Sequence, residues 1–310
     1  MSHAYVFPGQ GAQSIGMGRE LADSYKSAKA IFDEIDDVLG EKLSDLIWDG
    51  DAEVLTLTEN AQPALMATSM AAFRAMEEEG LGFDGVSFVA GHSLGEYSAL
   101  CAAGSLSVAD TARLLRIRGK AMQDAVPVGV GAMAAILGLD LPTVQEICAA
   151  AAKDQCCQAA NINDPSQIVI SGHKEAVERA AEAAKEKGAK RALMLPVSAP
   201  FHCTLMQPAA DRMAEALSEV EINKPTVPVV ANVKASAISE PEEIRAALIE
   251  QVTGSVRWEE SVRFMVDQGV TKTIEIGAGK ALSGMIRRIH KEMEVANVGT
   301  SADLAALKEE

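Results

Sequence analysis

The stretch GHSLG at residues 91–95 decides the fold, because it directly follows the apolar run 86–90 and directly precedes a helix-like segment, 96–103. In such a strand–turn–helix setting, two glycines allow a sharp turn that lifts the serine hydroxyl above the sheet. We therefore predict that Ser93 is a nucleophile and that the backbone N–H of Leu94 helps to stabilise an oxyanion. The alternative is a tight turn in which the serine only caps the helix.

Composition limits the kind of protein further. The chain has 310 residues, which is long enough for one large and one small domain. Hydrophobic residues make up 48% of it and aromatic residues only 4%, so aliphatic side chains and methionine must build the core. Such a core suits an α/β protein with many close contacts between helices and a sheet.

Charge, cysteine content and hydropathy argue against several classes. The net charge of −16 argues against a nucleic-acid partner, because phosphate binding needs a basic surface. Five cysteines without regular spacing argue against a disulfide framework and against a metal site. No apolar run is long enough to cross a bilayer, and the first residues, MSHAY, lack the basic segment of a signal peptide. We therefore expect a cytoplasmic protein that does not enter a membrane.

Strand and helix patterns alternate over most of the chain, which predicts a mostly parallel sheet covered by helices. The predicted strands are 4–7, 86–90, 227–231 and 271–276. The predicted helices are 18–38, 61–79, 96–103, a segment from 108 through 122 that Ser107 caps, 205–220, 242–252, 258–268 and 281–293.

Between residues 127 and 197 the order changes to β-α-β-β-α-β, the split unit of a ferredoxin-like domain. Its predicted elements are a strand at 132–138, a helix at 141–153, strands at 158–162 and 167–171, a helix at 174–187 and a strand at 191–196. We therefore expect a small domain, 127–197, inserted into a large α/β domain formed by 1–126 and 198–310.

A nucleophilic serine needs a base, and one of the five histidines has a suitable place. His202 lies in a loop between the last small-domain strand and the next large-domain helix, where active-site residues are common. A neutral imidazole there could accept the serine proton and return it to a leaving thiol. The alternative is a histidine that caps the following helix. Less suitable positions are those of His3, His92, His173 and His290.

The glycine-rich turn FPGQG at 7–11 follows the first predicted strand. A dinucleotide-binding loop would need G-x-G-x-x-G, and Ser14 stands at the third glycine position. A backbone N–H from the turn at Gln10 is better suited as a second oxyanion donor. The alternative is a tight turn without a catalytic role.

Five motifs occur together and in order along nearly the whole chain: FPGQG (7–11), GHSLGEYSAL (91–100), RIRGKAMQ (116–123), SAPFH (198–202) and EIGAG (275–279). As a set, they resemble the malonyl-CoA:acyl carrier protein transacylase family. This resemblance implies a hydrolase-like large domain with an inserted ferredoxin-like domain, which agrees with the division expected from the element order. One departure is Ala278, where the family often has proline, and we expect only a small effect on stability there.

The resemblance also implies roles for individual residues. Ser93 matches the nucleophile, His202 the base, and Arg118 the arginine that holds the free carboxylate of the malonyl group; a planar guanidinium suits that task because it donates two parallel hydrogen bonds. The other residues with implied roles are Gln10 and Leu94 as oxyanion donors, Gln251 as the residue whose carbonyl orients the histidine, Phe201 as the bulky residue that favours malonyl over methylmalonyl groups, Met122 and Asn163 as further substrate-binding residues, and Asn232 near the cleft.

The implied reaction is ping-pong transfer of a malonyl group from malonyl-CoA to the phosphopantetheine thiol of an acyl carrier protein, without a metal or bound cofactor. That carrier protein is typically acidic, and so is this chain, so we expect docking on a local basic patch of a monomer. The residues predicted for the patch are Arg287, Arg288, Lys190 and Arg191. The sequence leaves open whether the carrier serves fatty-acid or polyketide synthesis. A serine esterase or thioesterase, and a non-catalytic docking module, are the alternatives.

Overall fold

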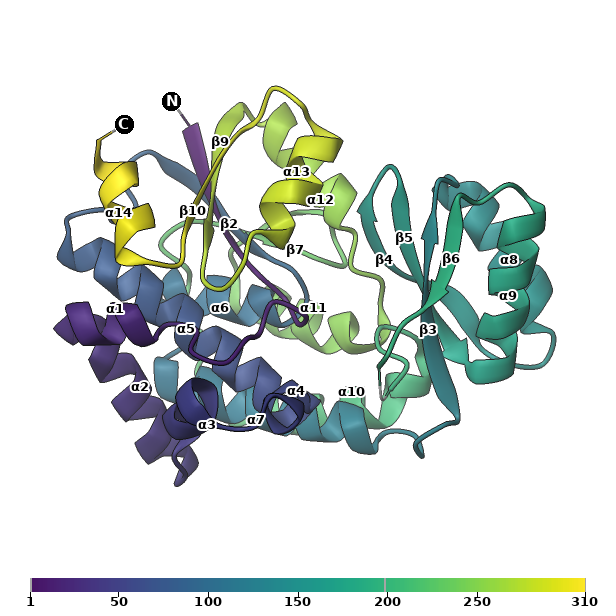
Figure 1. The fold of residues 1–310 in the computed structure, drawn as a ribbon, viewed down its shortest axis with the longest axis horizontal. Coiled ribbons are helices and arrows are strands. Elements are labelled where there is room, and N and C mark those ends of the chain that lie inside the picture. The colour runs from purple at the N-terminus through teal and green to yellow at the C-terminus, as the bar shows by residue number, and fades with distance from the viewer. Residues whose placement is uncertain (1, 198, 310) are drawn as a thin grey trace.

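The computed structural model describes residues 2–197 and 199–309, which form two β-sheets, each packed against helices (Figure 1). The large sheet and its helices use both ends of the chain, and the small sheet uses its middle. Ser198, the first residue of the SAPFH motif and of the predicted second part of the large domain, lies outside the described residues.

The large sheet has six strands in the order β10-β9-β1-β2-β7-β8, and all pairs are parallel except β7 with β8. This arrangement confirms the predicted α/β class with a mostly parallel sheet. The strands are β1 (Ser2–Phe7), β2 (Val86–Gly91), β7 (Val229–Ala231), β8 (Ser236–Ile238), β9 (Val270–Ile276) and β10 (Glu294–Val298).

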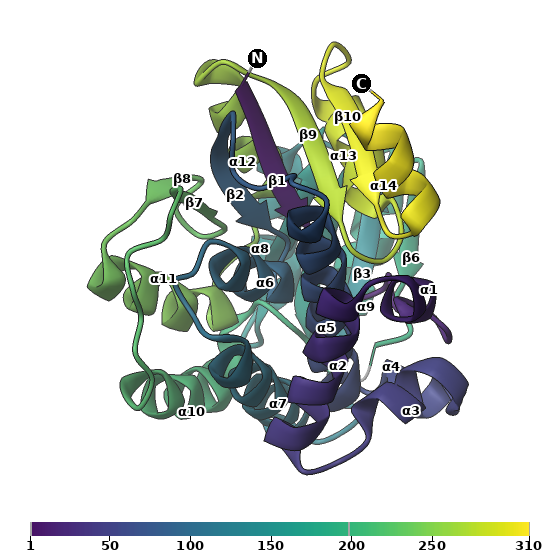
Figure 2. The same ribbon diagram turned by 90° about the vertical axis from the view of Figure 1, so that its left-hand side faces the viewer.

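Helices bury this sheet on both faces, as the alternation along β1 shows. Tyr5 and Phe7 pack into one hydrophobic cluster, and Ala4 and Val6 pack into another on the opposite face. The first cluster contains α5, α6, α7 and α10, and the second contains α12 and α13, as can be followed in Figure 2. The helices of this part are α1 (Arg19–Ser24), α2 (Lys26–Leu39), α3 (Leu43–Asp49), α4 (Ala52–Thr56), α5 (Thr58–Glu78), α6 (Leu94–Ala102), α7 (Val108–Asp124), α10 (Gln207–Ser218), α11 (Pro241–Thr253), α12 (Trp258–Asp267), α13 (Ala281–Ile289) and α14 (Ser301–Lys308).

The small sheet is antiparallel, with strand order β4-β5-β3-β6, and it carries its own hydrophobic cluster beneath two helices. Its elements follow the predicted β-α-β-β-α-β order: β3 (Gly131–Leu137), α8 (Leu141–Ala152), β4 (Cys157–Asp164), β5 (Gln167–His173), α9 (Lys174–Glu186) and β6 (Arg191–Met194). The domain boundaries at 127 and 197 stay a prediction, which this separate sheet supports.

Some predicted elements differ from the observed ones. The helix predicted over 18–38 is two helices, α1 and α2, because Tyr25 between them has an extended backbone (φ −124°, ψ 125°). Five further elements were not predicted: α3, α4, β8, β10 and α14. Most are short, and β10 (EVANV) places a small and a polar residue between its valines, so its pattern is weak.

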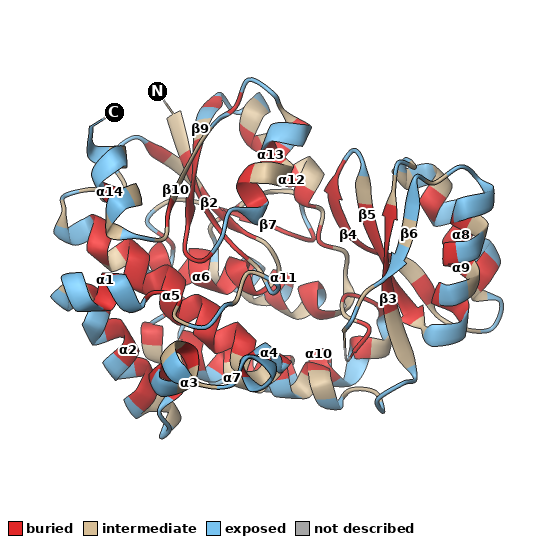
Figure 3. Ribbon diagram, in the orientation of Figure 1, coloured by how far each residue is buried: buried red, intermediate tan, exposed pale blue. Residues whose placement is uncertain are grey.

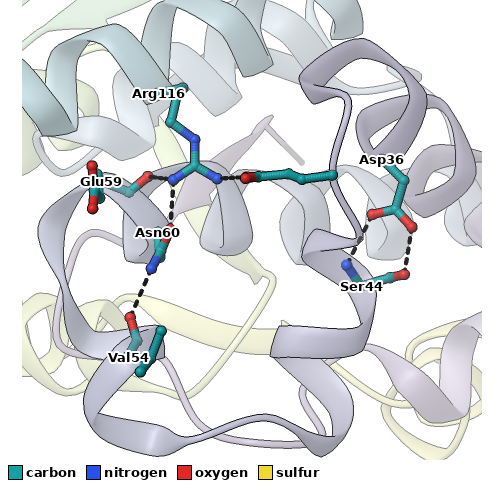
Figure 4. Close-up of polar contacts among 7 residues, drawn as sticks. Asp36, Ser44, Val54, Glu59, Asn60 and Arg116 are labelled. Carbon is teal, nitrogen blue, oxygen red and sulfur yellow. Dashed lines mark hydrogen bonds and ion pairs between the residues drawn. The ribbon is translucent and has the colours of Figure 1, made fainter.

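Two arginines of α7 have different surroundings. Arg116 donates hydrogen bonds to the carbonyl of Glu59 and to Oδ1 of Asn60 (Figure 4). It also forms an ion pair with Glu41. These contacts tie α7 to the start of α5 and to the loop after α2. Arg118, two residues later, lies on another side of the helix and is buried.

Burial follows the layers of both parts, with red interior faces and blue outer faces in Figure 3. Within residues 2–197 and 199–309, none of the helices combines the length and apolar character needed to cross a bilayer. That same portion of the chain has no cluster of three or more His, Cys, Asp or Glu side chains placed to hold a metal ion.

Candidate active site

Ser93 sits at a sharp turn between β2 and α6 with a strained backbone. Its φ of 54° and ψ of −110° are uncommon for a residue with a side chain. The turn needs glycine on both sides: a Cβ at Gly91 would lie 1.9 Å from the carbonyl carbon of Gly95, and one at Gly95 would lie 2.2 Å from the oxygen of Phe7. The predicted elbow is therefore present and presents the serine at the carboxyl end of β2.

The side chains of Ser93 and His202 meet although they are 109 residues apart. Oγ of Ser93 lies 2.8 Å from Nε2 of His202, and Nδ1 of His202 lies 2.9 Å from the carbonyl oxygen of Gln251. Because a carbonyl only accepts, Nδ1 carries the proton of a neutral imidazole and Nε2 accepts from the serine hydroxyl. Burial, with a further contribution from the positive charge of Arg118, lowers the pKa of His202 to about 3. The histidine is therefore neutral at physiological pH, as a general base must be.

Arg118 reaches the serine from α7 and is held on two sides. Nη1 donates to Oε1 of Gln62 (2.8 Å), and Nη2 donates to Oε1 of Gln251 (2.9 Å) and to Oγ of Ser93 (3.1 Å). The guanidinium is 1% exposed and lies 5.6 Å from the ring centre of Tyr97. A buried, always-charged group beside a nucleophile is suited to hold an anionic part of a substrate.

The two predicted oxyanion donors line the same cavity as Ser93. Leu94 is the first residue of α6, and the first amides of a helix have no partner within the helix. Gln10 follows β1, in a loop that packs tightly against the elbow: a Cβ at Gly9 would lie 2.6 Å from the carbonyl oxygen of His92. Two loop segments from neighbouring parallel strands thus border the serine.

A cavity of about 490 Å³ surrounds these groups and is lined by both parts of the molecule. All of the predicted substrate-binding residues line it, and Nε2 of His92 lies 2.9 Å from Oδ1 of Asn163 on its wall. The lining residues fall into two groups. From the large-sheet part come Gln10, Gln62, His92, Ser93, Leu94, Arg118, Met122, Leu282 and Met285, and from the small-sheet part and the following loop come Met133, Asn161, Asn163, Gln167, Val169, Leu195, Val197, Phe201 and His202.

Asn232, expected only to lie near the cleft, fixes the backbone of the elbow. Its Oδ1 accepts from the N–H of Ser93 (2.8 Å), and its Nδ2 donates to the oxygen of Gly91 (2.7 Å). It follows β7, the strand next to β2, so the parallel sheet brings it to the serine. A polar residue just after an apolar parallel strand was the sequence signal for it.

Two residues that hydrogen-bond to the predicted groups of the site were not themselves predicted from the sequence. Gln62 lies on the largely buried helix α5, where nothing in the local pattern distinguishes it. Glu96 lies in the first turn of α6 and is 1% exposed; its Oε2 accepts from the N–H of Asn232 and from Nε2 of Gln251, both at 2.9 Å. Burial raises the pKa of Glu96 to about 7, although these hydrogen bonds and Arg118 act in the opposite direction. A carboxylate inside the apolar start of a helix was a usable signal.

The residues predicted for a basic patch do not gather around the cavity. Arg288 lies on the side of α13 that faces the cleft, three residues after Met285, and its Nε forms an ion pair with the buried Asp164 at 2.8 Å. Arg287 instead lines a separate hollow with His3. Lys190 and Arg191 precede and begin β6, whereas the cavity-lining segment follows its end: Leu195, Pro196 and Val197.

Comparisons with known proteins agree with this geometry. The family model of the acyl transferase domain matches residues 4–306. The chain is 50% identical over 296 residues to a malonyl CoA-acyl carrier protein transacylase of Bacillus subtilis (strain 168), covering 95% of this chain and 92% of that protein. It is 46% identical over 306 residues to the protein of the same name in Escherichia coli (strain K12), covering 99% and 98%.

Solved structures show the same similarity. The crystal structure of an acyl-carrier-protein-S-malonyltransferase from Bartonella henselae is 56% identical, with a TM-score of 0.98, covering 100% of this chain and 99% of that one. A malonyl-transacylase in complex with its type II PKS acyl-carrier protein is 46% identical, with a TM-score of 0.97 and complete coverage of both chains.

Proposed function

This chain belongs to the malonyl-CoA:acyl carrier protein transacylase family of acyl transferases, and we propose that it moves malonyl groups from malonyl-CoA to an acyl carrier protein through an ester on Ser93. The observation that carries the proposal is the contact of one hydroxyl with both a neutral histidine and a buried arginine. Oγ of Ser93 lies 2.8 Å from Nε2 of His202 and 3.1 Å from Nη2 of Arg118.

In the first half-reaction, His202 accepts the proton of Ser93 as the oxygen attacks the thioester carbonyl. The tetrahedral oxyanion accepts hydrogen bonds from the backbone N–H groups of Gln10 and Leu94, each of which typically contributes about 3–4 kcal/mol to the transition state. Coenzyme A leaves as a thiol with the proton from His202. The carbonyl of Gln251 keeps the imidazole in the tautomer and orientation that this transfer requires.

In the second half-reaction, the thiol of the carrier protein's phosphopantetheine group attacks the malonyl ester. His202 accepts the thiol proton and returns it to Oγ of Ser93. Arg118 holds the carboxylate of the malonyl group, so that the ester carbonyl stays directed toward the two backbone donors. An acyl group fixed in this way leaves one direction of attack open, which favours the bound thiol over water.

Two side chains account for the choice of acyl group. Arg118 favours a carboxylated acyl group, because its buried charge gains an anionic partner. Phe201 lines the cavity beside the base and restricts the space for a branch such as that of a methylmalonyl group.

Mass spectrometry after incubation with malonyl-CoA tests the proposal. We expect a malonyl adduct on the peptide that contains Ser93 and no adduct in the Ser93→Ala variant. Parallel incubations with methylmalonyl-CoA and acetyl-CoA measure the tolerance of the site. The absence of a malonyl adduct in the wild-type protein would contradict the enzymatic function and would favour a docking module.

A serine esterase or thioesterase could use the same elbow, and Arg118 distinguishes it from a transferase. Replacement of Arg118 by alanine removes charge-assisted hydrogen bonds, each of which contributes about 1.5–3 kcal/mol, so malonyl loading should fall roughly 10- to 100-fold or more. Loading of uncharged acyl groups should fall less. Unchanged malonyl loading in this variant would contradict the role of Arg118.

The carrier protein also belongs to the proposal. Similarity to a transacylase in complex with a type II PKS acyl-carrier protein supports an acyl carrier protein as the partner and leaves both fatty-acid and polyketide synthesis open. Of the predicted basic patch, Arg288 has the most suitable position, because it pairs with Asp164, next to the cavity-lining Asn163, and follows the cavity-lining Met285 by three residues. Action as a cytoplasmic monomer that needs no metal or cofactor stays a prediction from the sequence.

A further inference from the structure

A buried carboxylate beneath the elbow has no part in the proton transfers described above. Glu96 lies in the first turn of α6 and is 1% exposed. Its Oε2 accepts hydrogen bonds from Nε2 of Gln251 and from the backbone N–H of Asn232. Burying a carboxylate costs free energy unless an opposite charge and hydrogen bonds compensate it, so its presence needs a reason.

Gln251 links this carboxylate to the arginine of the site. Its Nε2 donates to Glu96, and its Oε1 accepts from Nη2 of Arg118 at 2.9 Å. An ionised carboxylate only accepts, so it holds the NH₂ end of the amide and directs the carbonyl end to the guanidinium. Arg118 is also 1% exposed. The side-chain amide of Gln251 therefore links its buried positive charge to the buried carboxylate of Glu96.

We propose that Glu96 balances the charge of Arg118 in the free enzyme and takes up a proton from solvent when a malonyl carboxylate binds to Arg118. This inference rests on the function proposed above. The malonyl group adds a second negative charge near the same guanidinium, and two carboxylates that share one site favour protonation of one of them. The proton binds to a carboxylate oxygen of Glu96. In every molecule whose Glu96 is ionised in the free enzyme, the site therefore holds one positive and one negative charge both before and after loading.

The surroundings of Glu96 allow this change near neutral pH. Burial raises its pKa to about 7, and Arg118 on α7 is the charge acting on it within the described part of the chain. The strands β1, β2 and β7 and the helices α5 and α7 pack against α6. The titratable neighbours do not compete: burial raises the pKa of Tyr97 to about 12 and that of Cys101 to about 11, and it lowers the pKa of His202 to about 3 and that of His92 below its usual value.

Proton uptake can be measured directly. The wild-type enzyme is mixed with malonyl-CoA in weakly buffered solution containing a pH indicator, and the ester on Ser93 is quantified in the same sample by mass spectrometry. We expect about half a proton per malonyl ester at pH 7, because a group with a pKa of about 7 is half ionised there. Uptake should vanish toward pH 5, where Glu96 is already protonated.

Two controls isolate the effect of the malonyl carboxylate. Free coenzyme A at the same concentration corrects for ionisation of the released thiol. Acetyl-CoA, which has no carboxylate to place on Arg118, should cause no uptake beyond that correction. An equal uptake with acetyl-CoA would contradict the proposal.

Variants assign the proton to one residue. Glu96→Gln keeps an oxygen that can accept from Asn232 and Gln251 but has no charge, so it should load malonyl groups without proton uptake. Asp36→Asn is the matched control: Asp36 is also buried and accepts from the N–H and Oγ of Ser44, on α2 and away from the cavity (Figure 4). In this control, the number of protons taken up per malonyl ester should equal that of the wild type.

The outcomes separate this inference from the proposed function. Absence of a malonyl ester on Ser93 in the wild type contradicts the function itself. An ester that forms in the wild type without proton uptake, or an equal uptake in Glu96→Gln, overturns the role of Glu96. If Glu96→Gln does not fold, the wild-type pH profile still decides, because uptake that persists undiminished at pH 5 overturns the proposal.

Discussion

At the scale of single residues, Gln251 connects more of the site than any predicted catalytic residue does. Its backbone carbonyl orients His202, and its side chain contacts Arg118, Glu96 and the backbone oxygen of Ser93. The sequence resemblance implied the carbonyl contact only. The side-chain contacts depend on Gln251, near the end of α11, reaching Arg118 on α7 and Glu96 on α6, which no local pattern could reveal.

Gln251→Ala separates these two functions, because alanine keeps the backbone carbonyl. Loss of the amide leaves Arg118 and Glu96 without a shared partner, so we expect a decrease of about 1–3 kcal/mol in the free energy of unfolding and weaker preference for malonyl over acetyl groups. Urea denaturation measures the free energy of unfolding. Loading from a mixture of malonyl-CoA and acetyl-CoA measures the preference between the two acyl groups. Gln207→Ala, at an exposed glutamine bonded to Asp211, serves as the control and should change neither.

His202 makes a defined contribution to the pH dependence of stability. Its pKa is about 3 in the folded protein, against 6.5 ordinarily, so between these values the unfolded chain binds a proton that the folded chain does not. The free energy of unfolding therefore falls as the pH falls through this window, by about 2 kcal/mol from pH 7 to pH 5 for this residue alone.

The variant His202→Gln tests that contribution. Urea denaturation at pH 7 and pH 5 gives the loss of stability on acidification for the wild type and for the variant. The contributions of other groups, such as Glu96, cancel when one loss is subtracted from the other. The variant should lose less stability than the wild type on acidification. Equal losses in both proteins would show that His202 is not held neutral by burial.

At the scale of elements, the elbow depends on close contact between α6 and β1. A Cβ at Gly95 would lie 2.2 Å from the oxygen of Phe7. We expect Gly95→Ala to lower the free energy of unfolding by at least about 2 kcal/mol and to reduce malonyl loading, because the helix must move away from the strand. Gly82→Ala is the control, since a Cβ there meets no atom within 4 Å. A stable, fully active Gly95→Ala variant would contradict this description of the elbow.

Elements along which apolar residues recur with a clear helical or strand periodicity were predicted, and those without such a periodicity were not. The strand before Ser93 and the helix carrying Arg118 were found because apolar residues recur along them and because Ser107 caps α7. The break at Tyr25 was missed because neither glycine nor proline marks it. Gln62 was missed because α5 is buried almost all around, so its one functional face does not differ in polarity from the rest.

At the scale of the whole molecule, the cavity lies between the large-sheet part and the small-sheet part, and residues of both line it. Met133 and Asn163 of the small-sheet part line it opposite Ser93 of the large-sheet part. The element order predicted both sheets, but not their contact. For the same reason the basic patch was predicted from charge alone, and the structure separates Arg287 and Arg191 from the cavity.

Arg288 therefore provides the clearest test of docking. It is 49% exposed beside the cleft, whereas Arg191 lies at the far end of β6. We expect Arg288→Gln to raise the KM for the carrier protein several-fold at low salt, and expect added salt to reduce the difference. Malonyl loading of Ser93 should not change. Arg191→Gln is the matched control, and an effect of equal size in both variants would contradict docking near α13.

The central claim is that Ser93 holds the malonyl group between two separate transfers. The most direct test is to isolate the malonyl-enzyme free of coenzyme A and to add holo acyl carrier protein alone. We predict that the malonyl group moves from the Ser93 peptide to the phosphopantetheine thiol in equal amount, as followed by mass spectrometry of both proteins. Release of free malonate instead, or transfer that occurs only while malonyl-CoA is present, would contradict it.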